Sequence, residues 1–211
     1  MHTSTSTRTH ETTRRTSLFR WRTVDLVSVA MLGVAIGLVF WGWSQLYHVI
    51  SAVATVAFPP IAGLLTGPWL LGGVVGALVV RKPGAAMATE VVAASVEALL
   101  GNGWGLSNLV VGAIQGAGVE IVLAVLLFHR FGVLAAMAAA AASAVLGGLY
   151  SWAFYYTDWA AAAVVAYLAL FVVSGVLTSG LLGWLLVRGL ARTGVLDAFE
   201  VGRELADRQA A

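Results

Sequence analysis

The stretch that decides the fold runs from Arg81 to Glu120 and reads RKPGAAMATEVVAASVEALLGNGWGLSNLVVGAIQGAGVE. It carries three carboxylates and one carboxamide, at Glu90, Glu97, Glu120 and Gln115, within sequence that is otherwise apolar enough to span a membrane. Ionisable groups at bilayer depth are costly, so they tend to face the interior of a bundle and to serve a ligand, an ion or a proton path. The stretch therefore predicts a polar site inside a membrane protein, open to the outside.

The composition is that of an integral membrane protein. Of the 211 residues, 60% are apolar and only 10% are charged, whereas an ordinary soluble domain has about 25% charged residues. The sequence has no cysteine, which excludes disulfides, iron–sulfur clusters and thiolate metal sites. It also lacks a Walker phosphate loop and an H-E-x-x-H pattern, so we expect no ATPase activity, no catalytic metal and no enzyme.

Six apolar stretches are long enough to cross a bilayer, for which about 20 residues are needed. They are residues 24–43, 59–80, 84–101, 107–130, 133–152 and 160–188. With the N-terminus inside, all 12 Lys and Arg residues fall on the cytoplasmic side, as the positive-inside rule requires. The sequence predicts an all-α integral membrane protein, a bundle of six transmembrane helices with cytoplasmic N- and C-termini.

The chain is expected to divide into a membrane domain and two tails. Residues 1–22 are basic and rich in Ser and Thr, which is typical of a disordered cytoplasmic tail, and residues 23–190 form the membrane domain. Residues 191–211 are amphipathic and predict a cytoplasmic C-terminal tail. The segment 47–58 is too short to cross and is expected to re-enter the membrane or to lie at its outer interface. Pro68 is expected to kink the second crossing.

The spacing of the polar residues predicts that they lie at two depths. Glu90 and Glu97 are seven residues apart, so they share one face of a helix. Counting from the short turn at 102–106, Glu97 and Gln115 fall at one height, and Glu90 and Glu120 at a deeper one. No basic residue is predicted at these depths. The carboxylates are therefore either neutral hydrogen-bonding groups that fix helix packing, or partners of a cation that the protein does not supply.

Aromatic residues gather in the predicted outer loops, roughly 44–58, 102–106 and 153–159. Aromatic residues at this level most often form an interfacial belt. Their position beside the carboxylates leaves a role in ligand binding open.

Several segments carry a resemblance to a known family. They are TGPW (66–69), RKPGAA (81–86) with the glutamate that follows, LLGNGWG (99–105) and IQGAGVE (114–120). Residues 59–120 closely resemble the substrate-capture subunits, or S components, of energy-coupling-factor (ECF) transporters. The resemblance is to the YkoE type, which is linked to thiamine and its hydroxymethylpyrimidine precursor.

The resemblance implies a multi-pass subunit of the bacterial cytoplasmic membrane that binds a vitamin from outside. Such a subunit has no cofactor, because only its partners use ATP: it docks on a transmembrane coupling subunit driven by two ABC ATPases. In many members a small-residue face on the first helix contacts the coupling subunit. Gly33 and Gly37 supply that spacing here.

The thiazolium cation of thiamine also suits a site with carboxylates and aromatic rings. We expect Glu90 and Glu120 to make the deep polar contacts, and the residues nearer the mouth to be Glu97, Gln115, Asn102, Trp69, Trp104 and Tyr47. One alternative is a stand-alone carrier that loads protons or cations on Glu90 and Glu120. Another is a structural subunit in which the acids are only packed.

Overall fold

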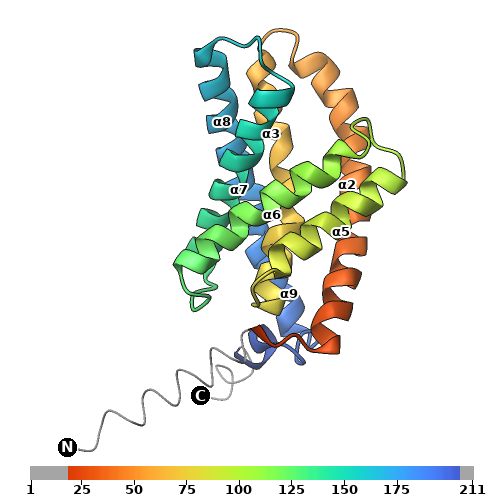
Figure 1. The fold of residues 1–211 in the computed structure, drawn as a ribbon, viewed down its shortest axis with the longest axis vertical. Helices are drawn as coiled ribbons and strands as arrows, with labels where there is room; N and C mark the ends of the chain where they lie inside the picture. Colours follow the sequence, from red (N-terminus) through yellow and green to blue (C-terminus); the bar gives the residue numbers. More distant parts are fainter. Residues whose placement is uncertain (1–18, 205–211) are drawn as a thin grey trace, which may run out of the picture.

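All regular secondary structure in the computed structural model is helical over residues 19–204, which are the residues that the structure describes (Figure 1). The helices are α2 (Thr23–Ala54), η1 (Pro59–Ile61), α3 (Ala62–Thr66), η2 (Gly67–Leu70), α4 (Leu71–Val80), α5 (Ala85–Leu99), α6 (Ser107–Val125), α7 (Val133–Phe154), α8 (Ala161–Gly175), η3 (Val176–Leu181) and α9 (Leu182–Arg192). Most of the tail expected at 1–22, up to residue 18, lies outside the described residues, as do residues 205–211.

Five helical segments are long and apolar enough to cross a membrane. They are Thr23–Ala54, Pro59–Val80, Ser107–Val125, Val133–Phe154 and Ala161–Arg192. The crossing expected at 84–101 is α5, which has only 15 residues and so rises about 22 Å. Since the hydrocarbon core is about 30 Å thick, α5 alone is short of a full span. It runs beside α6, and both cross the front of the bundle obliquely (Figure 1).

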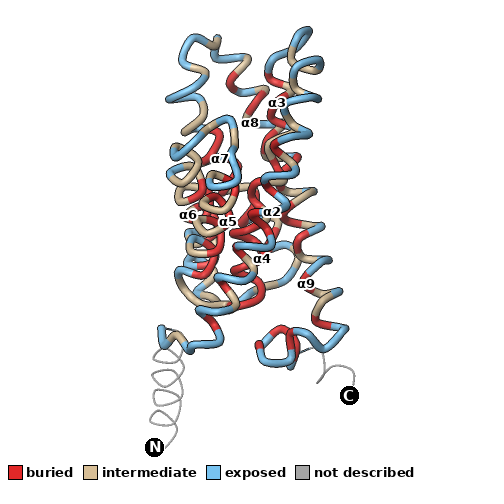
Figure 2. The backbone as a smooth tube through the Cα atoms, turned by 90° about the vertical axis from the view of Figure 1, so that its right-hand side faces the viewer, coloured by how far each residue is buried: buried red, intermediate tan, exposed pale blue. Residues whose placement is uncertain are grey.

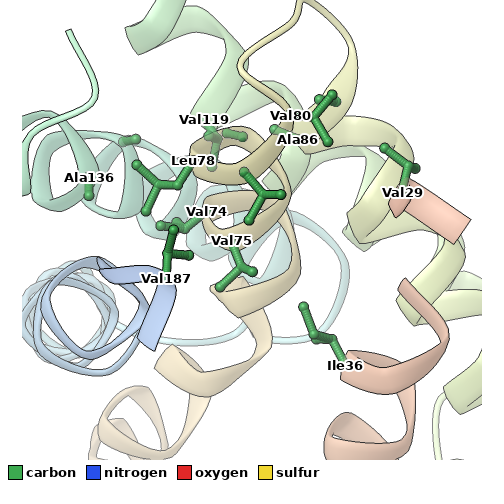
Figure 3. Packing of buried hydrophobic residues seen from close by; sticks show 14 of the residues in the cluster. Val29, Ile36, Val74, Val75, Leu78, Val80, Ala86, Val119, Ala136 and Val187 are labelled. Carbon is green, nitrogen blue, oxygen red and sulfur yellow. The ribbon is translucent and has the colours of Figure 1, made fainter. Parts of the chain in front are cut away.

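The core is built around α4, whose residues are buried from Gly72 to Val80. A helix that is apolar on every side is stable only when it is surrounded by other helices. Figure 3 shows Val74, Val75 and Leu78 of α4 among side chains of α2, α6, α7 and α9. Figure 2 shows that the buried residues gather in the middle and lower parts of the bundle, while the upper helix ends are mostly exposed.

The second crossing changes helix type where the sequence places its proline. Pro68 lies in the 3-10 segment η2, between α3 and α4. Proline has no backbone N–H and interrupts an α-helical hydrogen-bond ladder, so a break is expected at this point. The last crossing is continuous instead, because the π-helical turn η3 joins α8 to α9.

The first helix is longer than the sequence suggested. The expected crossing ended at residue 43, and the segment 47–58 was expected to re-enter the membrane or to lie at its interface, whereas α2 continues to Ala54. Residues 47–54 are therefore the last turns of the same helix and not a separate re-entrant segment. The segment 44–54 contains no Pro or Gly, so nothing in it ends the helix.

The described chain begins and ends at the same end of the bundle (Figures 1 and 2). Lys82 Nζ lies 2.6 Å from Asp25 Oδ2, and Arg81 Nη2 lies 3.0 Å from Glu204 Oε2. These ion pairs join the start of α2 and the last described residues to the turn between α4 and α5. In the C-terminal segment the side chains of Leu196, Phe199 and Val201 are buried, so this segment packs on the bundle as far as Glu204. We call this the basic end, and the opposite end the aromatic end.

Candidate functional site

A cavity of about 280 Å³ opens at the aromatic end of the bundle. Residues from both halves of the chain form its walls: Tyr47, Thr66, Trp69, Trp104, Asn108, Val111, Gln115, Ser151, Tyr155, Tyr156 and Tyr167. They come from α2, the second crossing, the α5–α6 loop, α6, α7, the α7–α8 loop and α8. None of the cavity residues within the described chain is charged at neutral pH.

Three aromatic residues predicted from the sequence form one cluster at this cavity. The ring centroids of Tyr47 and Trp69 are 5.2 Å apart, those of Trp69 and Trp104 are 5.3 Å apart, and those of Tyr47 and Trp104 are 5.5 Å apart. The imidazole of His48 stacks on the ring of Trp104, with the centroids 5.2 Å apart and the planes at 21°. Clustered rings of this kind present faces on which a planar or cationic ligand can stack.

Glu97 lies directly behind this cluster and is fully buried. Its Oε1 accepts hydrogen bonds from Ser44 Oγ and, at 3.0 Å, from Trp69 Nε1. Its Oε2 accepts one from Asn108 Nδ2 at 2.6 Å. A carboxylate with three donors is well satisfied, so Glu97 holds two cavity side chains in place, Trp69 and Asn108, and does not itself line the cavity.

Gln115 forms part of the wall contributed by α6. The side chain is buried and packs against Gly147 of α7, while Ser143 Oγ donates to its backbone oxygen at 2.8 Å. The side-chain carboxamide itself has no hydrogen bond to any group within residues 19–204. Because a carboxamide has two N–H donors and an acceptor oxygen, Gln115 can form hydrogen bonds with donor and acceptor groups of a ligand.

Tyrosines close the side of the cavity formed by α7 and α8. The hydroxyls of Tyr155 and Ser107 are 3.0 Å apart, which ties the α7–α8 loop to the start of α6. Tyr167 lines the same cavity as the hydroxyl-bearing residues Thr66 and Ser151. Burial raises the pKa of Tyr156, which lies in the loop outside the helices, so its hydroxyl is neutral at physiological pH. This side of the cavity therefore offers hydroxyl groups to a ligand.

The two glutamates expected to make the deep contacts do not reach the cavity. Glu90 is buried between α5 and α4, where Oε2 accepts a hydrogen bond from the backbone N–H of Gly73. Glu120 Oε1 accepts one from the N–H of Ala86 at 2.8 Å, in the first turn of α5. Helix N-termini have N–H groups without partners in the helix, and carboxylates stabilise them. Both side chains therefore have structural partners, and we do not include them in the site.

Asn102 does not line the cavity but forms hydrogen bonds within the loop that carries Trp104. Its Oδ1 accepts hydrogen bonds from the N–H groups of Trp104, at 3.1 Å, and Gly105, at 2.6 Å. These contacts shape the loop that presents Trp104. The Nδ2 group is buried and has no partner among the residues that the structure describes.

Comparison with known proteins shows which proteins this chain resembles in sequence and fold. Residues 24–146 match the family described as the permease component of an ABC-type cobalt transport system. The protein named HMP/thiamine permease protein YkoE of Bacillus subtilis (strain 168) is 30% identical over 191 residues, which are 90% of this chain and 94% of that protein. A crystal structure of an S component of an ECF transporter superposes with a TM-score of 0.84, at 30% identity, over 90% of this chain and 96% of that one.

The chain belongs to the YkoE family of ECF transporter S components. It is a transport component and not an enzyme, and it is a multi-pass protein of the bacterial plasma membrane.

The glycines expected to dock this S component on a coupling subunit lie inside the bundle. A Cβ atom on Gly33 would lie 2.5 Å from Val92 Cγ1, and one on Gly37 would lie 2.6 Å from Val96 Cβ. Both glycines thus allow α2 to approach α5 closely. They have no surface left for a partner, and the expected docking role does not fit their position.

Sequence reasoning missed the side of the S-component cavity built from α7 and α8. Tyr155 and Tyr156 were noted only as aromatic residues of the loop 153–159, for which an interfacial belt and a ligand role both stayed open, and Tyr167 was not singled out. A signal was present for Tyr167, because a phenol in the middle of an apolar helix needs a hydrogen-bond partner. Asn108 carried a similar signal, since it follows the turn 102–106 by only two residues.

Proposed function

We propose that this S component captures thiamine, or its hydroxymethylpyrimidine moiety, from outside the cell. The observation that supports this most strongly is the cavity itself, in which the rings of Tyr47, Trp69 and Trp104 are combined with the carboxamide of Gln115. The name of the Bacillus subtilis relative points to the same ligands.

The chemistry of the cavity suits both halves of thiamine. An aminopyrimidine is planar and has donor and acceptor edges, which aromatic faces and the amides of Gln115 and Asn108 complement. The thiazolium carries a permanent positive charge, and aromatic faces stabilise such a cation by about 0.5–2 kcal/mol. The carboxyl group of Glu97, which accepts the hydrogen bond from Trp69 Nε1, holds one of these aromatic faces in place.

We propose an orientation in which the aromatic end faces outward. The basic residues of the described chain then lie in the cytoplasm, in agreement with the positive-inside rule. This orientation requires six crossings, with α5 spanning together with the turns that flank it. Delivery of the ligand would depend on a coupling subunit and two ABC ATPases as partners, which alone use ATP.

A calorimetric titration tests this function. We expect the purified protein to bind thiamine with saturation, and to bind hydroxymethylpyrimidine, which has no cation, more weakly. Trp104→Ala should weaken thiamine binding about tenfold, because it removes a stacking face. Trp152→Ala is the matched control, since Trp152 is exposed at the same end and does not line the cavity.

Absence of saturable binding to both ligands would contradict the proposal. Uptake into proteoliposomes offers a second test, because we expect it to require the ATPase partners. Uptake driven by an ion gradient alone would instead favour a stand-alone carrier. That alternative is the weaker one, since Glu90 and Glu120, which it needs as proton carriers, bind helix N-termini.

A further inference from the structure

A second cavity lies at the basic end of the bundle, where α2 begins and α4 ends. Its volume is about 420 Å³. The charged side chains on its walls are Arg20, Arg22, Arg81, Lys82, Arg203 and Glu200. A concave surface whose walls carry mostly one sign of charge concentrates ions of the opposite sign. The cavity is separate from the aromatic one, and thiamine capture makes no use of it.

The carboxylate of Asp25 neutralises part of the positive charge of this cavity. It is fully buried and lies 2.6 Å from Lys82 Nζ and 2.9 Å from Arg22 Nη2. Lys82 Nζ also donates to the backbone oxygen of Arg20 at 2.5 Å. These contacts fix the rim of the cavity between the start of α2 and the α4–α5 turn.

Arg81 is held in place on the shared wall of this cavity and a neighbouring one. Its Nη2 pairs with Glu204 at 3.0 Å, and its guanidinium lies 4.8 Å from the centre of the Phe131 ring. Its backbone is left-handed, with φ at 54°. A residue with a Cβ atom adopts this conformation at a cost and keeps it only where the surroundings determine it. The guanidinium is therefore preorganised.

Among the residues that the structure describes, an excess of positive charge remains at this cavity after these pairs are formed. Arg20 and Arg203 have no ion pair with any residue that the structure describes. The five cationic side chains of the cavity outnumber the three nearby carboxylates, those of Asp25, Glu200 and Glu204, by two charges. An anion from outside the chain would balance them.

We propose that this cavity binds a phosphate group, carried by an anionic phospholipid or by a free solute. Guanidinium groups match the oxygens of a phosphate with paired hydrogen bonds, and several of them surround the cavity. Basic pockets among transmembrane helices on the cytoplasmic side are typical sites for anionic headgroups. Beside the cavity, Val24 and Val27 of α2 are exposed and provide an apolar surface along which an acyl chain can lie. This surface favours a lipid as the source of the phosphate.

Titration of the purified protein with soluble short-chain lipids tests the site. We expect short-chain phosphatidylglycerol to bind and short-chain phosphatidylcholine to bind much more weakly. The double variant R20Q/R203Q should weaken phosphatidylglycerol binding roughly 10- to 30-fold, because each arginine near a headgroup contributes to anion binding. The control R130Q/R192Q removes two exposed arginines outside the cavity and should leave the affinity unchanged.

Relative affinity identifies the source of the phosphate. If inorganic pyrophosphate binds more tightly than short-chain phosphatidylglycerol, with the same sensitivity to R20Q/R203Q, the source is a free phosphate compound. If the lipid binds more tightly, the site is a lipid site. The site is refuted if neither ligand binds, or if the two double variants lose equal affinity. Should R20Q/R203Q fail to fold, R203Q alone must show a loss of roughly threefold to tenfold.

Discussion

Glu97 connects four segments of the chain through one buried carboxylate. Its partners are Ser44, Trp69 and Asn108, and two of these line the aromatic cavity. Glu97, which the sequence predicted as a ligand contact near the mouth, lies behind two side chains that line the cavity and holds them in place. This role makes its effect on binding indirect and testable.

Glu97→Gln should weaken thiamine binding about tenfold. The amide places an N–H₂ donor where the carboxylate accepted hydrogen bonds, so at least one of Trp69 Nε1 and Asn108 Nδ2 loses its acceptor. Calorimetry gives the affinity, and thermal unfolding in detergent shows whether the variant folds normally. The role assigned to Glu97 would be wrong if the affinity were unchanged in a variant that folds normally.

Glu90→Ala should reduce stability without changing ligand affinity. The substitution leaves the N–H of Gly73 buried without its acceptor, which costs about 1–3 kcal/mol. Thermal unfolding in detergent measures the loss, and a thiamine titration of the same sample measures the affinity. If Glu90→Ala bound thiamine more weakly but unfolded at the same temperature as the unmodified protein, Glu90 would belong to the binding site.

At the scale of helices, the sequence showed which residues share a face but not which neighbour that face meets. The spacing of Glu90 and Glu97 correctly placed both on one side of α5, yet one residue faces α4 and the other faces the aromatic cluster. The two glutamates meet different parts of the second crossing, since Trp69 lies in the 3-10 segment η2 and Gly73 at the start of α4. The glycine pair on α2 was ambiguous for the same reason, since small residues serve internal and external contacts equally well.

Gly37→Val should separate α2 from α5 and destabilise the bundle by about 1–3 kcal/mol. A Cβ atom at this position would lie 2.6 Å from Val96 Cβ. Gly42→Val, in the same helix, is the control, because a Cβ atom there has no neighbour within 4 Å. Equal melting temperatures for the two variants would show that the close packing of α2 on α5 contributes nothing to stability.

At the scale of the whole molecule, the chain separates an aromatic, neutral cavity from a basic end. The clustering of Lys and Arg in the sequence already indicated this polarity. The sequence could not show that Leu196, Phe199 and Val201 bring the C-terminal segment onto the bundle, because their pattern is also that of a free amphipathic helix.

Lys82→Met should destabilise the basic end, because buried Asp25 then keeps only Arg22 as a partner. We expect a loss of about 1–3 kcal/mol. The double variant K82M/D25N should recover part of it, since no buried charge is left unpaired. Thermal unfolding of the single and double variants checks this, and a double variant less stable than K82M would contradict the pairing.

The most direct test of the proposed site compares one cavity residue with one glutamate outside it, by calorimetric titration with thiamine. We predict that Gln115→Ala weakens binding about tenfold, because its carboxamide faces the cavity, and that Glu120→Gln leaves the affinity unchanged. The opposite pattern, with normal binding in Gln115→Ala and lost binding in Glu120→Gln, would contradict the site.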